Sequence, residues 1–302
     1  MFPRVLFSLL ALTGAVLAAG AQGLPPVEAG ALAAIHSSPR HADWVSIPAG
    51  SDKFDAWVVY PERPDKAPVL VLIHEIFGLN DWARATADAY AAQGFLVIAP
   101  DLLSGKAPDG KGGSAALGPD AGRLAVSKLD PAEVTSRLDA AARWATSQPS
   151  ALASYGVVGF CWGGGVSYSW ATTQPGLKAS VGFYGVAPAP EAIARIQAPV
   201  LALYGGSDAR VTSTLEGFRD QMTRLGKRFE AEVYEGAGHA FLRVQDGQNG
   251  ANLKAAQAAW PRSVAFLKAA LEAKVPVSQA KKLAVPAGFA PVDCCQDLIT
   301  GS

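Results

Sequence analysis

A cysteine at the centre of a glycine-flanked turn is the residue in this chain best suited to covalent chemistry. Cys161 lies in the segment Gly159-Phe160-Cys161-Trp162-Gly163, after an apolar run and before a helix-like stretch. Small residues at the flanking positions let the chain turn sharply and lift the central side chain above a sheet. A thiolate attacks acyl carbon well if a base lies beside it or its pKa is lowered. By itself, the motif also fits a small buried cysteine on a turn.

A cysteine nucleophile needs a base, and the sequence offers one well-placed histidine. The chain has four histidines: His36, His41, His74 and His239. The first two lie in or near an expected linker, whereas His239 follows the last expected strand within the small-residue loop 236–241. A histidine in such a loop can reach over the edge of a sheet and act as a general base. The alternative is a histidine on a surface loop.

An acidic residue that orients the base completes the expected triad. Asp208 follows the apolar run 200–204, in the sequence Gly-Gly-Ser-Asp. An ordinary turn aspartate would look the same. However, the order Cys161, Asp208, His239 is the nucleophile–acid–histidine order of α/β-hydrolases, and each member follows an expected strand. The sequence therefore predicts a Cys-His-Asp triad.

An oxyanion hole requires two backbone N–H groups near the attacked carbonyl. We expect one from Trp162, the residue after the nucleophile. We expect the other from Ile76, in the loop that follows the run 69–73.

The elements that must position these residues alternate along the chain. Several expected strands are continuous Val/Leu/Ile runs, as in strands that are covered on both faces. Strands alternating with helices predict an α/β fold, a doubly wound and mainly parallel sheet of about eight strands flanked by helices. The expected strands are 43–47, 54–60, 69–73, 95–99, 155–160, 179–184, 200–204 and 229–234. The expected helices are 82–93, 131–146, 163–173, 212–225 and 251–273, while 104–120 is an expected glycine-rich loop.

Four segments make up the expected domain organisation. Residues 1–21 have the pattern of a signal peptide, with Arg4 before an apolar stretch and a small-residue cleavage site. Residues 22–41 are an expected linker, 42–273 the α/β-hydrolase domain and 274–302 a C-terminal extension that contains Cys294 and Cys295. We therefore expect an exported protein, periplasmic or secreted, without stable membrane insertion after signal removal; a membrane anchor is the alternative.

Charge and motifs exclude several other classes. The chain has 26 basic and 26 acidic residues, so its net charge is zero and gives no electrostatic basis for binding nucleic acid. The segment 105–112 approaches a phosphate-binding loop but has Gly112 where Ser or Thr should stand. A zinc-protease pattern begins at His74 but has Gly78 where its second histidine should stand, and no dinucleotide fingerprint opens the first βα unit. We expect neither a cofactor nor a metal.

Taken together, five short motifs make the chain resemble the dienelactone hydrolase family. This resemblance implies an α/β-hydrolase whose Cys-His-Asp triad acts on esters or lactones without metal or cofactor. The motifs are His74-Glu75-Ile76-Phe77-Gly78-Leu79-Asn80, Ala99-Pro100-Asp101-Leu102, Gly159-Phe160-Cys161-Trp162-Gly163-Gly164, Tyr204-Gly205-Gly206-Ser207-Asp208 and Gly238-His239-Ala240-Phe241-Leu242-Arg243.

The resemblance also implies roles for two charged residues. It implies that Glu75 contacts the resting thiol and helps to take its proton when substrate arrives, and that Arg243 binds a substrate carboxylate. In the segment 103–128, which corresponds to the place of the family's second substrate-binding arginine, Arg123 is the one candidate. Arg84 on the first expected helix is either a further family match or an exposed helix residue. A structural acid and a solvated loop arginine are the alternatives for Glu75 and Arg243.

We therefore expect a carboxylic ester hydrolase of the carboxymethylenebutenolidase type, with a small-molecule ester or lactone as its substrate. A general carboxylesterase or thioesterase is the alternative among enzymes. A non-catalytic binding protein with the same fold is the alternative from another class, because a fold does not determine a function. The sequence leaves the oligomeric state open.

Overall fold

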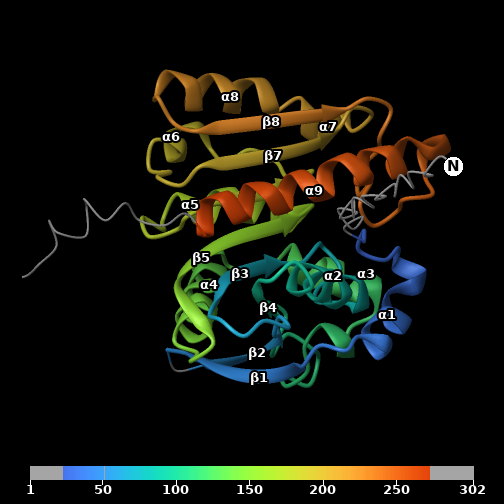
Figure 1. The fold of residues 1–302 in the computed structure, drawn as a ribbon, viewed down its shortest axis with the longest axis vertical. Helices are drawn as coiled ribbons and strands as arrows, with labels where there is room; N and C mark the ends of the chain where they lie inside the picture. Colours follow the sequence, from blue (N-terminus) through green and yellow to red (C-terminus); the bar gives the residue numbers. More distant parts are fainter. Residues whose placement is uncertain (1–22, 51, 273–302) are drawn as a thin grey trace, which may run out of the picture.

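Eight strands form one sheet at the centre of the molecule (Figure 1). The computed structural model describes residues 23–50 and 52–272. The strand order is β1-β2-β4-β3-β5-β6-β7-β8. The first two strands pair antiparallel with their neighbours, and the other six run parallel. The predicted mainly parallel sheet is confirmed. The expected signal peptide 1–21 and extension 274–302 lie outside the described residues.

The central strands are apolar on both faces because helices cover both. All seven residues of β3 and all six of β7 are buried. The strands are β1 (Ala42–Ala49), β2 (Asp52–Val59), β3 (Ala67–Ile73), β4 (Leu96–Pro100), β5 (Ala151–Phe160), β6 (Ser180–Phe183), β7 (Val200–Gly205) and β8 (Phe229–Tyr234). This burial explains why the parallel strands were recognisable as uninterrupted apolar runs.

Two groups of helices make the doubly wound arrangement. Helices α1, α2 and α9 pack into one apolar core with one face of the sheet, and α4, α5 and α8 contribute to the core on the other face. The helices are α1 (Ala31–Ser37), α2 (Asp81–Ala91), α3 (Pro119–Val126), α4 (Pro131–Thr146), α5 (Trp162–Ala171), α6 (Pro190–Ile193), α7 (Ala209–Thr212), α8 (Leu215–Arg224) and α9 (Ala251–Leu271). None of the helices within the described ranges has the length and apolar character needed to cross a membrane.

Two expected elements, a loop and a helix, differ from the structure. The expected loop 104–120 ends in α3, because Pro119 starts a helix at its first position, where proline is favoured. The single helix expected over 212–225 is two helices, α7 and α8. Between them, the N–H and hydroxyl groups of Thr214 both bond to the carbonyl of Val211, which makes a tight turn instead of continuous α-helix.

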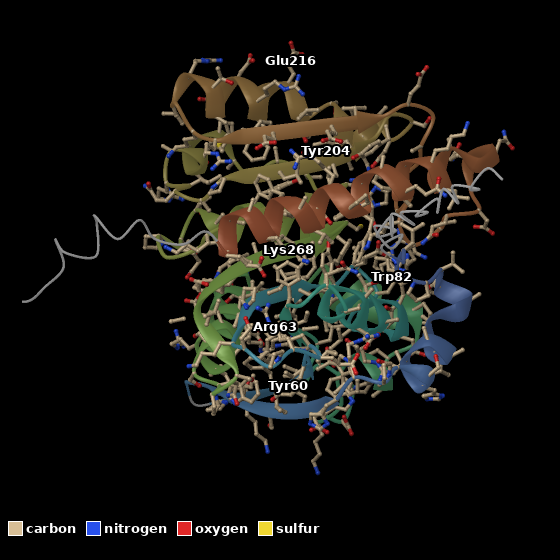
Figure 2. The ribbon with its side chains drawn as sticks, in the orientation of Figure 1. Tyr60, Arg63, Trp82, Tyr204, Glu216 and Lys268 are labelled. Atoms are coloured by element: carbon tan, nitrogen blue, oxygen red, sulfur yellow. The ribbon has the colours of Figure 1, made fainter. Side chains whose placement is uncertain are left out.

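The described part of the expected linker packs against the domain. It contains a 3₁₀ turn (Glu28–Gly30) followed by α1, whose first residue Ala31 is buried. Trp82, labelled in Figure 2, lies buried on α2 and donates its indole N–H to the carbonyl of Pro26 at 3.1 Å. A buried tryptophan N–H needs such a partner, so this bond attaches the N-terminal segment to the domain.

Candidate active site

Cys161 occupies a sharp turn between β5 and α5. Its backbone has φ 55° and ψ −118°, a conformation that costs energy for any residue with a side chain. A Cβ atom on Gly159 would overlap the carbonyl group of Gly163, and one on Gly163 would overlap the carbonyl of His74. The glycines are therefore required for the turn, which presents the Cys161 side chain at the carboxyl end of the sheet.

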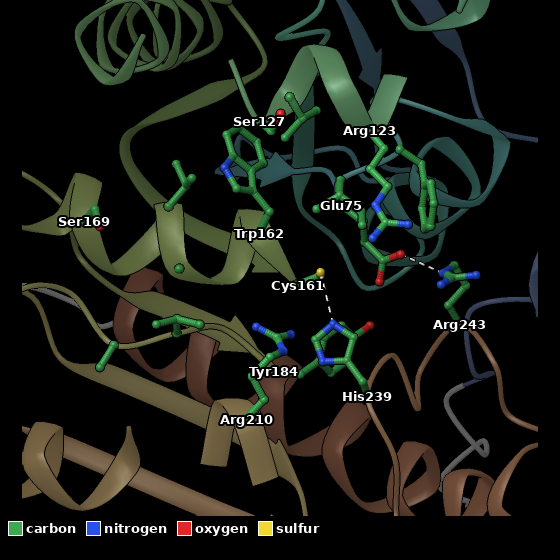
Figure 3. A pocket seen from close by; sticks show the side chains of 17 residues that line it. Glu75, Arg123, Ser127, Cys161, Trp162, Ser169, Tyr184, Arg210, His239 and Arg243 are labelled. Atoms are coloured by element: carbon green, nitrogen blue, oxygen red, sulfur yellow. Dashed lines mark hydrogen bonds and ion pairs between the residues drawn. The ribbon is translucent and has the colours of Figure 1, made fainter. Parts of the chain in front are cut away.

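The predicted triad residues meet at this edge of the sheet, as Figure 3 shows for Cys161 and His239. His239 Nε2 lies 3.1 Å from Cys161 Sγ, and its Nδ1 lies 2.5 Å from Asp208 Oδ2. A carboxylate accepts hydrogen bonds, so Nδ1 carries a ring proton, and in the neutral tautomer with that proton the acceptor Nε2 faces the thiol. Asp208 follows β7 and is buried, whereas His239 lies in the loop after β8. The imidazole is thus oriented to take a proton from Sγ.

The backbone N–H groups of Trp162 and Ile76 both reach the cysteine sulfur. The pKa of the Cys161 thiol is raised to about 11, mostly by burial and to a smaller extent by the charge of Glu75. Hydrogen bonds from the N–H groups of Trp162 and Ile76, and the charge of Arg210, act in the opposite direction. Two N–H groups that stabilise negative charge at Sγ can also stabilise an oxyanion on a carbon bonded to Sγ.

The reactivity of Cys161 towards iodoacetamide is expected to rise continuously from about pH 7 to 10. A raised pKa leaves the group protonated at neutral pH, and below the pKa the thiolate fraction grows about tenfold with each pH unit. The measurement is the alkylation rate of the Cys161 peptide by mass spectrometry, which separates it from Cys294 and Cys295. A rate that levels off below about pH 8 would show a resting thiolate instead.

A buried glutamate lies beside the thiol but is bonded to an arginine. Glu75 is 3% exposed, and its Oε2 accepts a 2.6 Å hydrogen bond from Arg243 Nε (Figure 3). Its Oε1 has no hydrogen-bond partner among the described residues. Burial raises the pKa of Glu75, while Arg243 acts to lower it. Glu75 acts on the resting thiol through its charge, and no hydrogen bond joins the two side chains within the described residues.

Arg243, the expected carboxylate anchor, has two carboxylate partners already. Besides Glu75, its Nη1 donates to Glu28 Oε2 at 2.6 Å. Its guanidinium also lies 5.2 Å from the ring centroid of Phe77. Burial lowers the pKa of Arg243, but the charges of Glu75 and Glu28 outweigh this and raise it overall. Arg243 is therefore permanently charged, with its charge balanced inside the protein.

A cavity of about 700 Å³ opens above Cys161. Its polar groups include the guanidinium groups of Arg123 on α3 and Arg210 on α7 (Figure 3). Arg84 lines a neighbouring cavity of about 620 Å³ instead, where it pairs with Asp81. Much of the first cavity's wall is apolar, formed by Ile76, Phe77, Val126, Trp162, Val166, Tyr184, Val186 and Ala187.

Hydrogen bonds around a buried aspartate hold the loop that carries Ile76. Asp101 accepts bonds from the N–H and hydroxyl of Ser114, at 2.8 and 2.6 Å. The Ser114 hydroxyl oxygen in turn accepts a 2.7 Å bond from the N–H of Leu79. Gly78 has φ 79°, and a Cβ there would overlap Ser114. This network gives Asp101 and Gly78, both in the motifs quoted above, a structural role next to Ile76.

Tyr184 and Arg210 are among the cavity residues that sequence reasoning missed. Tyr184 follows β6 with φ 41°, and its ring lies 5.0 Å from that of His239. Its hydroxyl is buried near the Glu75 carboxylate, and burial and next the charge of Glu75 raise its pKa, so it remains a donor. Arg210 comes two residues after Asp208. The signal for both was their position just after parallel strands, where side chains gather at one edge of the sheet.

Comparisons with known proteins point to one family. The sequence model of the "Dienelactone hydrolase family" matches residues 54–271. A "Putative carboxymethylenebutenolidase" of Escherichia coli is 28% identical over 239 residues, covering 75% of this chain and 86% of that protein. A protein of the same name from Salmonella typhimurium is 32% identical over 208 residues, covering 65% of this chain and 76% of that protein.

A solved structure is similar over the same region. The crystal structure of a "Putative Dienelactone Hydrolase" from Klebsiella pneumoniae superposes with a TM-score of 0.66 at 30% identity, covering 76% of this chain and 98% of that one. The family match extends from β2 to the end of α9, so it includes all the strands that carry the candidate site. The chain therefore belongs to the dienelactone hydrolase family and is a hydrolase with the α/β-hydrolase fold.

Proposed function

We propose that this protein hydrolyses carboxylic esters or lactones through a Cys-His-Asp triad and an acyl-enzyme intermediate. The observation that carries the proposal is the 3.1 Å contact between His239 Nε2 and Cys161 Sγ, with His239 Nδ1 bonded to Asp208. Nucleophile and base lie within hydrogen-bond reach, and the base is oriented by a third group. The names of the relatives, which refer to hydrolysis of a lactone, support the same class of substrate.

The reaction follows from the positions of these groups. Cys161 Sγ attacks the carbonyl carbon as its proton passes to His239 Nε2, and the carbonyl oxygen becomes an oxyanion bonded to the N–H groups of Ile76 and Trp162. This tetrahedral intermediate then collapses: the bond between the carbonyl carbon and the ester oxygen breaks, and the leaving oxygen takes the proton from His239. Water, deprotonated by His239, then attacks the thioester carbon and the C–S bond breaks. The acid is released, and His239 returns its proton to the sulfur, which restores the thiol.

Glu75 supplies a second proton acceptor for this thiol. At neutral pH the free enzyme holds Cys161 protonated, because burial and the charge of Glu75 raise its pKa to about 11. The thiol therefore passes its proton to a base as it attacks the carbonyl carbon. His239 Nε2 is the acceptor within hydrogen-bond reach of the sulfur, and the Glu75 carboxylate is the second acceptor that we propose.

A general carboxylesterase is a second candidate, favoured by the cavity wall. Side chains such as Phe77, Trp162 and Val166 offer a broad apolar surface to an acyl chain. Uncharged acyl groups gain from burial against such a surface. Under this alternative, the catalytic chemistry at Cys161 is unchanged and only the preferred substrate differs.

Trapping the acyl-enzyme tests the proposed function. The protein is mixed with a lactone, an oxoester and a thioester in parallel and quenched in acid, and the mass of the Cys161 peptide is measured. An acyl adduct on Cys161 that turns over is expected, with greater accumulation in His239→Ala if that variant still acylates, since deacylation needs the base. Absence of both adduct and turnover with all three substrates would favour a non-catalytic binding protein.

A further inference from the structure

One residue of the N-terminal segment reaches the edge of the candidate active site. Glu28 lies 215 positions before Arg243 in the chain, yet its Oε2 accepts a 2.6 Å bond from Arg243 Nη1. Arg243 Nε is bonded to Glu75 at the same distance. The guanidinium thus lies between two carboxylates and against the ring of Phe77, and its side chain is only 14% exposed. The bond to Glu75 is buried, whereas the Glu28 carboxylate is 53% exposed, so the charge-assisted bond between Arg243 and Glu28 is partly screened by solvent.

Several other bonds hold Glu28 in this place. The backbone N–H of Glu28 points to the carbonyl of Arg243 at 3.4 Å. The side-chain amide of Gln245, two residues beyond Arg243, donates to the carbonyl of Pro25 at 2.9 Å. Trp82 binds the next carbonyl, that of Pro26. The segment is therefore attached to the same loop that carries His239 and Arg243, so that Glu28 keeps a defined position.

The two carboxylates change what Arg243 presents to a ligand. The Arg243 guanidinium is hydrogen-bonded to both carboxylates, so much of its positive charge is offset before any ligand binds. The remaining cations of the cavity, Arg123 and Arg210, make no ion pair within 4.0 Å with any residue in 23–50 or 52–272. Attraction for an anionic ligand therefore comes from Arg123 and Arg210, whereas Arg243 contributes little.

We propose that Glu28 is a specificity-determining residue: by occupying Arg243 Nη1 and balancing its charge, it disfavours substrates that carry a carboxylate near the scissile carbonyl. This rests on the proposed ester hydrolysis at Cys161. Arg243 lines both the Cys161 cavity and the neighbouring cavity that Glu28 lines. A change in the charge of Glu28 therefore changes the electrostatic potential that Arg243 presents in the Cys161 cavity. Removing the Glu28 charge releases a guanidinium N–H for a substrate carboxylate.

A matched pair of esters measures this selectivity. The 4-nitrophenyl half-ester of succinic acid carries a carboxylate, and 4-nitrophenyl butyrate is its neutral counterpart. In Glu28→Gln, the ratio of kcat/KM for the acidic ester to that for the neutral ester is expected to rise about tenfold, mainly through KM, as for one gained charge-assisted contact. Adding Arg243→Gln to Glu28→Gln should abolish this rise. Glu216→Gln, the same charge change on α8 (Figure 2), should leave the ratio unchanged.

Two outcomes would overturn the proposal. An unchanged ratio in Glu28→Gln would show that Glu28 does not affect selectivity. An equal loss on both esters would show that Glu28 only holds the loop of His239 and Arg243 in place.

A binding measurement separates this proposal from the proposed function. Calorimetric titration with succinate and with uncharged succinamide needs no turnover. Glu28→Gln is expected to bind succinate about tenfold more tightly than the wild type and succinamide equally well. If neither ester is hydrolysed but succinate binding improves, the proposed function fails while the assignment of Glu28 holds. If both esters are hydrolysed but succinate binding is unchanged, the assignment of Glu28 fails alone.

Discussion

Cys161→Ala is expected to reduce kcat/KM for a hydrolysable ester by about 10⁴-fold or more, the loss seen when an enzyme's covalent nucleophile is removed. The variant retains the turn glycines Gly159 and Gly163, and alanine fills less space than cysteine, so the fold should persist. Steady-state kinetics with 4-nitrophenyl butyrate measure kcat/KM, and the thermal unfolding midpoint checks that the fold is retained. Turnover within tenfold of the wild type would refute the proposed nucleophile.

Cys161→Ser gives a finer test of the same assignment. Serine preserves the size of the side chain, but its hydroxyl is far less acidic than a thiol, in a cavity that already raises the pKa of the thiol to about 11. Its activity should therefore be much closer to that of Cys161→Ala than to that of the wild type. Cys294→Ala, a cysteine outside the described residues, serves as the control and should hydrolyse the ester at the wild-type rate.

Asp208→Asn is expected to lower kcat by up to about 10⁴-fold while changing KM little. Asp208 Oδ2 accepts a 2.5 Å hydrogen bond from His239 Nδ1, and Asp208 does not line the Cys161 cavity. An asparagine amide can donate to Nδ1, which would move the ring proton to Nε2, where it faces the thiol. His239 would then be unable to accept the proton of Cys161.

The control for this prediction is Asp220→Asn. Asp220 is exposed on α8 and forms only a long 3.9 Å pair with Arg224, so its neutralisation should not affect kcat. A loss of less than tenfold in Asp208→Asn would contradict the orienting role of Asp208. An equal loss in both variants would indicate a general effect of charge.

Local sequence features were sufficient to predict the sheet and the order of the candidate triad. The central parallel strands are buried on both faces, so their sequences are short apolar runs. Such runs can be identified as strands without knowledge of distant contacts. Cys161 immediately follows β5, Asp208 follows β7 by three positions and His239 follows β8 by five. Because the carboxyl ends of parallel strands lie at one edge, position along the chain predicted their proximity.

Local patterns were less informative where turn chemistry competed with composition. Glycines and prolines in 104–120 suggested a loop to its end, but Pro119 is also a favourable first residue of a helix. The helical pattern over 212–225 likewise predicted one continuous helix and gave no sign of the turn at Thr214. In both places, the same residue types are compatible with two local structures, and contacts with the rest of the domain decide between them.

The electrostatic state of the site was decided only by the tertiary structure. The pKa of Cys161 depends on how deeply the thiol is buried and on the charge of Glu75, 86 positions earlier in the chain. The charge balance of Arg243 depends on Glu28, in a segment whose sequence suggested a linker. Desolvation and ion pairing act through space and have no periodic signature in a sequence. The residue types and their order were therefore readable from the chain, whereas the charges they present to a substrate follow from folding.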